Sequence, residues 1–224
     1  MIKQLQKQLH SRSAKDRAKA AEKLGQLGEL AHPCVPDLIE ALNDPKREVR
    51  VKATLALGFL EAVEAVNTII QLLKEENDMV RSAAVGTLSL LRDAQVVQPL
   101  LQLLKDKNHE IRDRTLRALG RIGDPISVQP LIKALNDPVP FVRWGAAVGL
   151  GFLGSPEAIE PLISLALCDE DRNLRWRAVE ALGDIGNRRA VQPLRRIIDD
   201  ENEDPDVQIA ATIALNKIKG IKTA

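Results

Sequence analysis

The residues in this sequence that could most readily do chemistry are carboxylates standing six positions before an arginine. Such acid–base couples suit proton transfer or the binding of an anion. Five couples have this spacing: Asp44/Arg50, Glu75/Arg81, Asp106/Arg112, Asp137/Arg143 and Asp169/Arg175. A catalytic centre gathers its groups in one place, whereas these couples recur along the chain. We therefore interpret them as structural and predict no catalytic residue.

Other reactive groups are sparse. His109 and Glu110 form a single histidine–glutamate pair, whereas a metal ion needs several converging ligands. The two cysteines, Cys34 and Cys168, lie far apart without a CxxC spacing, which favours free, buried thiols. No nucleotide-binding loop, GxSxG or HExxH motif occurs. The sequence therefore predicts no metal and no cofactor, and favours a protein that is not an enzyme.

The composition is that of a folded chain with balanced charge. The 224 residues are 45% hydrophobic and 28% charged, and the net charge is +1, so no strongly charged partner is indicated. No apolar run approaches the roughly 18 residues of a membrane span. The opening residues also lack the apolar core of a signal peptide. We expect a cytoplasmic protein with no membrane partner.

A sequence repeat of about 31 residues positions the acid–base couples. An apolar residue followed by arginine recurs at Val49-Arg50, Val80-Arg81, Ile111-Arg112, Val142-Arg143 and Leu174-Arg175. A helical pattern follows each pair, as in "WGAAVGLGFL", and another precedes it, as in "PLIKAL". Weaker copies occur at Arg17 and Gln208. The sequence predicts an all-α protein, an α-solenoid of about seven stacked helical hairpins in a right-handed superhelix.

The boundaries of the repeats suggest one domain over residues 1–224. We predict an N-terminal capping unit over residues 1–30, central repeats over 31–186, and a C-terminal unit and tail over 187–224. Asp44 and Asp137, each followed by proline, are expected to cap the second helix of their hairpins. Gly28, Gly123, Gly154 and Gly186 are expected to end second helices in the left-handed conformation.

Two long phrases carry a resemblance to a known family: "DKNHEIRDRTLRALGRIGDPISVQPLIKALNDP" (residues 106–138) and "EDRNLRWRAVEALGDIGNRRAVQPLRRI" (residues 170–197). They resemble HEAT repeats, specifically the short HEAT-like repeats named after phycobilisome lyases. The resemblance implies that the carboxylates and arginines form a ladder of ion pairs between neighbouring repeats, with Arg143 paired to Asp137. The terminal copies, Ser11/Arg17 and Asn202/Gln208, lack the couple and are expected to lie outside the ladder.

Positions +1, +5 and +9 after each arginine form one stripe along each second helix. We call these positions, taken together over the repeats, the stripe. Its residues change from apolar to basic to acidic between repeats, and four of the five aromatic residues lie on it. HEAT repeats place their second helices on the concave side, so we predict a partner-binding surface there. Its residues are Trp144, Val148, Phe152, Trp176, Leu55, Phe59, Leu90, Arg117, Arg121, Glu180 and Asp184.

The glycines of the fifth repeat invite two different predictions. Gly151 recurs at the same position in other repeats, which indicates close packing between helices. Gly145 and Gly149 are not shared in this way and lie beside Trp144 and Phe152. We expect them to clear space for a ligand. The alternative that the aromatic rings fill gaps in the core stays open.

Three functions remain at this point. The first is a non-enzymatic scaffold that binds a protein segment on its concave face, either as a homo-dimer, as a hetero-dimer or with another partner. The resemblance implies a second: a phycobilin lyase or isomerase subunit, or a phycobilisome-degradation factor. Such a protein would bind a phycobiliprotein and a bilin, whose propionates Arg117 and Arg121 could hold. Nucleic-acid binding is disfavoured, because Asp113, Glu180 and Asp184 interrupt the basic residues.

Overall fold

The computed structural model describes residues 1–220, and within them it contains α-helices and 3₁₀ turns but no strand. The prediction of an all-α solenoid is confirmed. Every predicted second helix is present. These helices are α2 (Ala14–Gln26), α4 (Arg47–Phe59), α6 (Asp78–Leu91), α8 (His109–Ile122), α10 (Pro140–Leu153), α12 (Arg172–Ile185) and α14 (Pro205–Lys219).

The first helices of the hairpins are shorter. They are α1 (Ile2–Leu9), α3 (Val35–Glu40), α5 (Val66–Leu72), α7 (Val97–Gln102), α9 (Val128–Ala134), α11 (Ile159–Cys168) and α13 (Val191–Asp199). From α3 onward, a 3₁₀ turn precedes each of them: Gly28–Cys34, Val63–Ala65, Ala94–Val96, Pro125–Ser127, Pro156–Ala158 and Arg188–Ala190. The prolines of "PLIKAL" and its counterparts lie in the first helical turn, where the missing N–H leaves no bond unmade.

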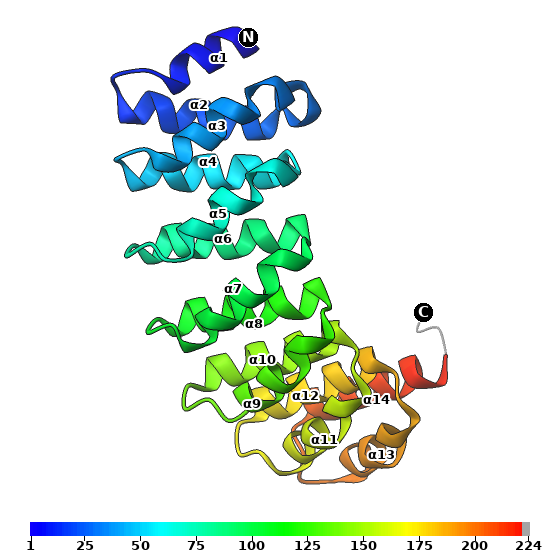
Figure 1. The fold of residues 1–224 in the computed structure, drawn as a ribbon. Coiled ribbons are helices and arrows are strands. Elements are labelled where there is room, and N and C mark those ends of the chain that lie inside the picture. The colour runs from blue at the N-terminus through cyan, green and yellow to red at the C-terminus, as the bar shows by residue number, and fades with distance from the viewer. Residues whose placement is uncertain (221–224) are drawn as a thin grey trace. The chain divides into compact units, whose positions relative to one another are not determined.

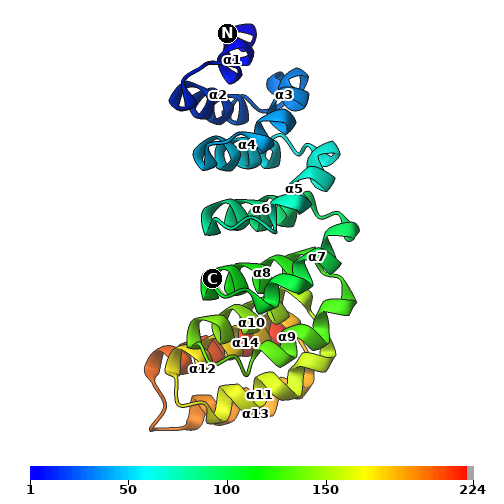
Figure 2. The same cartoon turned by 60° about the vertical axis from the view of Figure 1, so that its left-hand side comes forward.

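The chain forms two compact units, which are residues 1–103 and residues 104–224. In unit 1, helices α2, α4 and α6 lie side by side in one layer and α3 and α5 in another (Figure 1). In unit 2, helices α8, α10, α12 and α14 form one layer and α9, α11 and α13 the other (Figure 2). The handedness of the superhelix and the single repeat domain with its three parts stay predictions.

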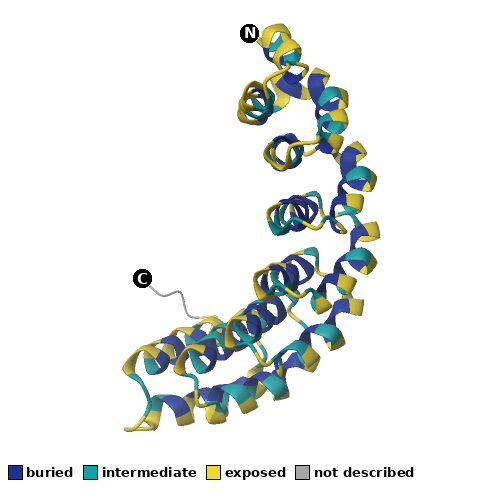
Figure 3. Cartoon of the chain, turned by 90° about the vertical axis from the view of Figure 1, so that its left-hand side faces the viewer, coloured by how far each residue is buried: buried dark blue, intermediate teal, exposed yellow. Residues whose placement is uncertain are grey.

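The core of each unit lies between its two layers. The buried surfaces of the first and second helices face one another within each hairpin (Figure 3). Small and aliphatic side chains fill this space, among them Leu57 and Leu88 in unit 1 and Leu116, Leu150 and Leu182 in unit 2. A core without large rings suits helices that approach one another closely, because short side chains allow small distances between axes.

Glycine sets the closest of these approaches. A Cβ on Gly120 would lie 2.3 Å from the carbonyl oxygen of Gly149, and a Cβ on Gly149 would lie 2.6 Å from that of Leu116. A Cβ on Gly145 would lie 2.2 Å from Asp113 Oδ1. The prediction that Gly145 and Gly149 clear space for a ligand is therefore wrong: they let α10 pack against α8.

Gly151 behaves as predicted. A Cβ there would lie 3.1 Å from the Cα of Ala181, so this glycine marks the contact of α10 with α12. Its counterpart Gly183 stands in the same relation to Ala214 of α14, where the distance would be 2.8 Å. The recurring glycines thus keep successive second helices close, at the cost of about 1 kcal/mol each in helix propensity.

The ends of the helices follow the sequence in part. Gly123, Gly154 and Gly186 are left-handed C-caps, as predicted. Asp44 and Asp137 are not N-caps, since Lys46 caps α4 and Val139 caps α10. Each aspartate instead accepts the main-chain N–H two residues on, at 2.8 Å and 2.9 Å respectively. That turn leaves a carboxylate oxygen free for a guanidinium.

The cysteines and the lengths of the helices bear on two further predictions. Both cysteines are free, as predicted, but only Cys34 is buried and Cys168 is exposed. Burial, together with the charge of Asp37, raises the pKa of the Cys34 thiol. Over residues 1–220, the helices are all too short or too polar to span a lipid bilayer.

Candidate functional site

Each arginine of the ladder first binds its own repeat through the main chain. Its guanidinium donates to the carbonyl oxygen of the residue six positions earlier. The Nη1–O distances are 2.8 Å for Arg17, Arg50 and Arg112, 2.7 Å for Arg81, 3.2 Å for Arg143 and 2.9 Å for Arg175. The six-residue spacing seen in the sequence is therefore a side-chain to main-chain bond that closes the loop before each second helix.

The carboxylates of Asp44, Glu75 and Asp137 pair with an arginine of the preceding repeat instead of their own. The predicted pairing of Asp169 is wrong: its carboxylate accepts the Asp171 N–H and forms no ion pair with residues 1–220. The inter-repeat ion pairs are Arg17–Asp44 at 2.5 Å, Arg50–Glu75 at 2.9 Å, Arg112–Asp137 at 3.1 Å and Arg175–Glu203 at 2.6 Å. The expectation that the terminal copies lie outside the ladder is wrong, because Arg17 and Glu203 both take part. Each carboxylate lies 25–28 residues after the arginine that it binds. The sequence prediction had paired each arginine with the carboxylate six residues before it.

The ladder shifts the pKa of its carboxyl groups. Burial alone would raise the pKa of Asp137, but hydrogen bonds from Arg112 and from the Val139 N–H outweigh burial and hold that pKa below its usual value. The same balance lowers the pKa of Asp44, whose guanidinium partner is Arg17. These carboxylates are therefore charged over the whole neutral range.

Between the fifth and sixth repeats, an indole takes the place of the guanidinium. Trp144 donates its Nε1–H to Asp171 Oδ2 at 2.8 Å, and Asp171 also caps α12 by accepting from the Asn173 N–H. The Trp144 ring meets Phe141 edge-on with centroids 5.8 Å apart, and Phe141 meets His109 in the same way at 6.4 Å. Trp144 is half-buried and joins two repeats, which is a structural role that the sequence had not assigned to it.

Residues at the same stripe position on neighbouring helices of unit 2 lie side by side. Position +9 of α8 and α10 brings the Arg121 guanidinium over the Phe152 ring, 5.3 Å from its centroid. Position +9 of α12 and α14 brings Asp184 within 2.8 Å of Lys217 Nζ. Equal positions of the stripe thus meet on α8 and α10 and on α12 and α14, and α10 packs against α12.

Most stripe residues of unit 2 are exposed or half-buried. Phe152 is 47% exposed, and Ile209 and Ile213 of α14 are 59% and 43% exposed. Asp113 is the exception. It is buried beneath Arg117, with which it forms an ion pair at 2.8 Å. Burial raises the pKa of Asp113, opposed by the charge and hydrogen bond of Arg117.

Charges on the stripe are largely paired around the aromatic rings. Arg177 lies over the ring of Trp176 at 4.2 Å and forms an ion pair with Glu180 at 2.9 Å. Glu180 and Asp184, which we predicted to be partner-binding residues, each form an ion pair with a cation of the same unit. Arg121 forms no ion pair with any of residues 1–220.

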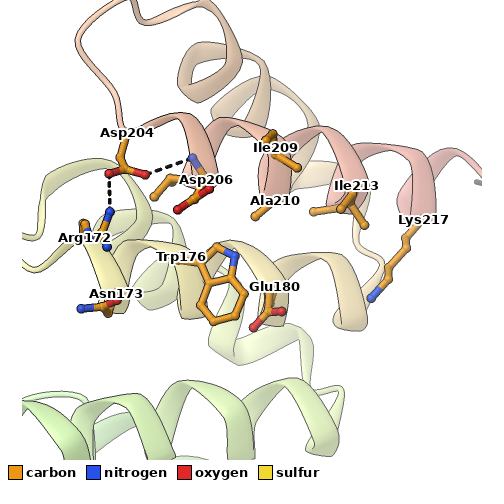
Figure 4. Close-up of a pocket in the computed structure, with 12 residues that line it drawn as sticks. Arg172, Asn173, Trp176, Glu180, Asp204, Asp206, Ile209, Ala210, Ile213 and Lys217 are labelled. Carbon is orange, nitrogen blue, oxygen red and sulfur yellow. Dashed lines mark hydrogen bonds and ion pairs between the residues drawn. The ribbon is translucent and has the colours of Figure 1, made fainter.

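A groove of about 430 Å³ lies between α12 and α14 (Figure 4). Trp176, Ala210, Ile209 and Ile213 give it an apolar lining, and charged side chains stand at both ends. Arg172 and Asp204 pair at 2.7 Å at one end. The predicted partner-binding set included Trp176 but omitted Ile209 and Ile213, although both occupy stripe positions of the seventh repeat.

The predicted residues of unit 1 are also exposed. Leu55 is 37% exposed, Phe59 64% and Leu90 58%. They lie on α4 and α6, which pack side by side. No groove in unit 1 includes them among those found within residues 1–103. They are exposed apolar side chains on adjacent second helices.

Metal-binding side chains do not gather in the described part of the chain. Residues 1–220 contain no group of three or more histidine, cysteine, aspartate or glutamate side chains placed to hold a metal ion. The predictions of no metal, no cofactor and no catalytic residue stay predictions.

Known proteins share this pattern of repeats. The family described as HEAT repeats matches residues 2–89, 35–116, 66–148, 97–172 and 159–224. The chain belongs to the HEAT-repeat family. No curated protein matches this sequence.

Solved structures share the fold over nearly the whole chain. The complex of CpcE and CpcF of phycocyanin lyase from Nostoc sp. PCC7120 matches with a TM-score of 0.64 and 25% identity, covering 97% of this chain and 94% of that one. YibA of E. coli matches with a TM-score of 0.71 and 20% identity, covering 97% and 81%. An archaeal HEAT-like repeat protein from Thermococcus onnurineus NA1 matches with a TM-score of 0.61 and 14% identity. The match covers 98% of this chain and 97% of the archaeal one.

The ladder predicts a loss of stability at acid pH. Because the folded pKa of Asp137 is lowered, its contribution is complete above the unfolded pKa of about 3.9 and is lost as the pH falls through the folded value. We expect Asp137→Asn to lower the free energy of unfolding by about 2 kcal/mol at pH 7. The gap to the parent protein should close below about pH 4, as followed by urea unfolding.

Glu64→Gln serves as the control for this experiment, since Glu64 is exposed and forms no ion pair with residues 1–220. It should leave stability unchanged at every pH. A gap for Asp137→Asn that stays constant from pH 7 to pH 3 would contradict the role given to this carboxylate.

The two tryptophans are expected to respond differently to phenylalanine. Trp144→Phe keeps the ring but removes the bond to Asp171, so we expect a loss of about 1–2 kcal/mol in unfolding free energy. Trp176→Phe should be nearly neutral, because the Trp176 indole N–H bonds to no group within residues 1–220. Thermal and urea unfolding of the two variants measure the difference, and equal losses would show that the Trp144–Asp171 bond adds nothing.

Proposed function

We propose that this protein is a non-enzymatic scaffold that binds a segment of a protein partner on the stripe of unit 2. One observation carries the proposal. The second helices of unit 2 bury leucines such as Leu116, Leu150 and Leu182, yet leave the apolar side chains of Phe152, Trp176, Ile209 and Ile213 exposed or half-buried. Exposed apolar surface rimmed by charge is typical of recognition sites.

Energetics support a ligand at this face. Covering a side chain of this size removes apolar area worth about 1.5–3 kcal/mol, so a few such contacts supply micromolar affinity after the entropic costs of association. Aromatic residues dominate binding energy at interfaces. The chain has only five aromatic residues, and this face holds Trp144, Phe152 and Trp176.

A related assembly also supports this proposal. The matched phycocyanin lyase structure is a complex of CpcE and CpcF, in which chains like this one assemble with a protein partner. Partner binding through the stripe, which we predicted to line a concave face, agrees with that use of the fold. Under this proposal the partner could also be a second HEAT-repeat chain.

Selection of random twelve-residue peptides displayed on phage tests the proposal without knowledge of the partner. Peptides enriched on the parent protein should bind Trp176→Ala and Phe152→Ala at least tenfold more weakly, because each substitution removes an apolar contact. Ile126→Ala is the matched control and should bind normally, because Ile126 is exposed on the turn before α9, in the other layer of unit 2.

Thermal unfolding of each variant must accompany the selection, so that a loss of binding is not confused with a loss of fold. Enriched peptides that bind all three variants equally would contradict the proposal. The same holds if no peptide is enriched on a folded parent protein.

A bilin lyase subunit is the second candidate function. The match of 25% identity to the CpcE and CpcF complex of phycocyanin lyase favours it. Arg117 and Arg121 beside Phe152 would provide cations and a ring for a tetrapyrrole with two propionates. Under this proposal a bilin is the ligand and a phycobiliprotein the partner.

Absorption spectroscopy distinguishes this candidate. Mixing the protein with phycocyanobilin should shift the visible spectrum, and apo-phycocyanin should co-elute with it in gel filtration. Arg117→Ala together with Arg121→Ala should abolish the shift, whereas Arg188→Ala together with Arg189→Ala on the other layer should not. An unchanged spectrum and separate elution would remove this candidate.

A further inference from the structure

Unpaired charges of opposite sign border the stripe of unit 2 at two corners. On α8, Arg121 at position +9 is exposed, and so is Arg114, which lies two turns earlier at position +2 beside the stripe. Neither forms an ion pair with residues 1–220, while Arg117 neutralises Asp113. This corner is positive. Near the beginning of α14, Arg172 pairs with Asp204, and Asp206 remains exposed without an ion pair in the same range. This corner is negative.

An apolar path joins the two corners diagonally. It begins at Phe152, level with Arg121, and continues through Val148 of α10. It then reaches the half-buried Trp176 at position +1 of α12 and ends at Ile209 of α14, three residues after Asp206. The charges along this path are already neutralised, because Arg177 binds Glu180 and Lys217 binds Asp184. Only the two ends present uncompensated charge.

We propose that the occupant of the stripe is an extended peptide segment with an acidic end, an apolar middle and a basic end. Its acidic end lies at Arg114 and Arg121, and its basic end lies at Asp206. This inference rests on the proposed function and specifies the chemistry of the partner at the same site. Complementary charges at the rim fix orientation and exclude other partners more than they add affinity.

The geometry of the layer sets the length of this segment. Crossing from α8 to α14 spans three gaps between helix axes, each about 8–10 Å. Along the helix axes, the path runs from the level of position +9 to the level of position −2. This distance is about 16 Å at 1.5 Å per residue. The diagonal is therefore about 31 Å, which an extended chain covers with about nine or ten residues. Shorter segments reach only one corner.

Binding of synthetic ten-residue peptides, followed by fluorescence anisotropy, tests the charge pattern. The first peptide has two glutamates, six residues with alternating leucine and serine, and two lysines. The second has the same composition with glutamates and lysines mixed at both ends. We expect the first peptide to bind about tenfold more tightly at low salt, with the difference shrinking at high salt.

A change of specificity provides the sharper test. Arg114→Glu together with Arg121→Glu makes both corners acidic, so this variant should bind the first peptide about tenfold more weakly. It should prefer a third peptide with lysines at both ends. Lys23→Glu together with Lys52→Glu, in unit 1, is the matched control and should keep the order of the parent protein. Circular dichroism checks that each variant is folded.

The possible outcomes separate the two proposals. Equal affinity of the first two peptides overturns the charge pattern, and it leaves the proposed function intact if Trp176→Ala still abolishes binding. An unchanged preference after the arginine reversal also overturns the charge pattern. If none of the three peptides binds, an extended segment is the wrong occupant; a folded partner or a bilin would then account for the face, as the phage and spectroscopic experiments would show.

Discussion

The two-ended bonding of one arginine side chain is the interaction on which the repeats depend. In each repeat from the first to the sixth, the guanidinium binds a carbonyl of its own loop. Arg17, Arg50, Arg112 and Arg175 each also bind a carboxylate of the repeat that follows. Five donors in a planar fork allow both contacts at once, which a lysine could not make. The arginine thus couples the conformation of one hairpin to the position of the next.

Close helix packing is the second constraint, and it explains the unusual composition. Glycines such as Gly120 and Gly149 bring second helices together until backbone meets backbone. Little room then remains inside for rings, so the core is built of leucine, valine and alanine. Aromatic residues in such a protein are found at the surface or at joints. Trp144 is at a joint, and Phe152 is at the surface.

The stripe gains its character from this arrangement. The core is filled from the other faces of the second helices, so most side chains at positions +1, +5 and +9 are exposed or half-buried. Asp113, however, is buried, and Trp144 bonds to Asp171. The side chains of the stripe differ from repeat to repeat, and neighbouring charges neutralise one another around Trp176. What remains is an apolar face with two uncompensated corners. Under the proposed function, these positions would set the choice of partner, while the ladder maintains the fold.

The sequence by itself determined the class of fold, the number of second helices and the identity of the stripe. A repeat with helical periodicity has few ways to bury its apolar residues, and left-handed glycines such as Gly154 end helices for local reasons. It did not determine which carboxylate meets which arginine, because partners 25 residues apart become neighbours only when hairpins stack. The roles of Gly145 and Gly149 were wrongly predicted for the same reason. Whether a missing side chain leaves a space or admits a neighbouring helix depends on what packs against it. The tertiary structure alone decided that Trp144 bonds Asp171 and that Ile209 and Ile213 complete a groove with Trp176, since these relations join residues of adjacent repeats across space.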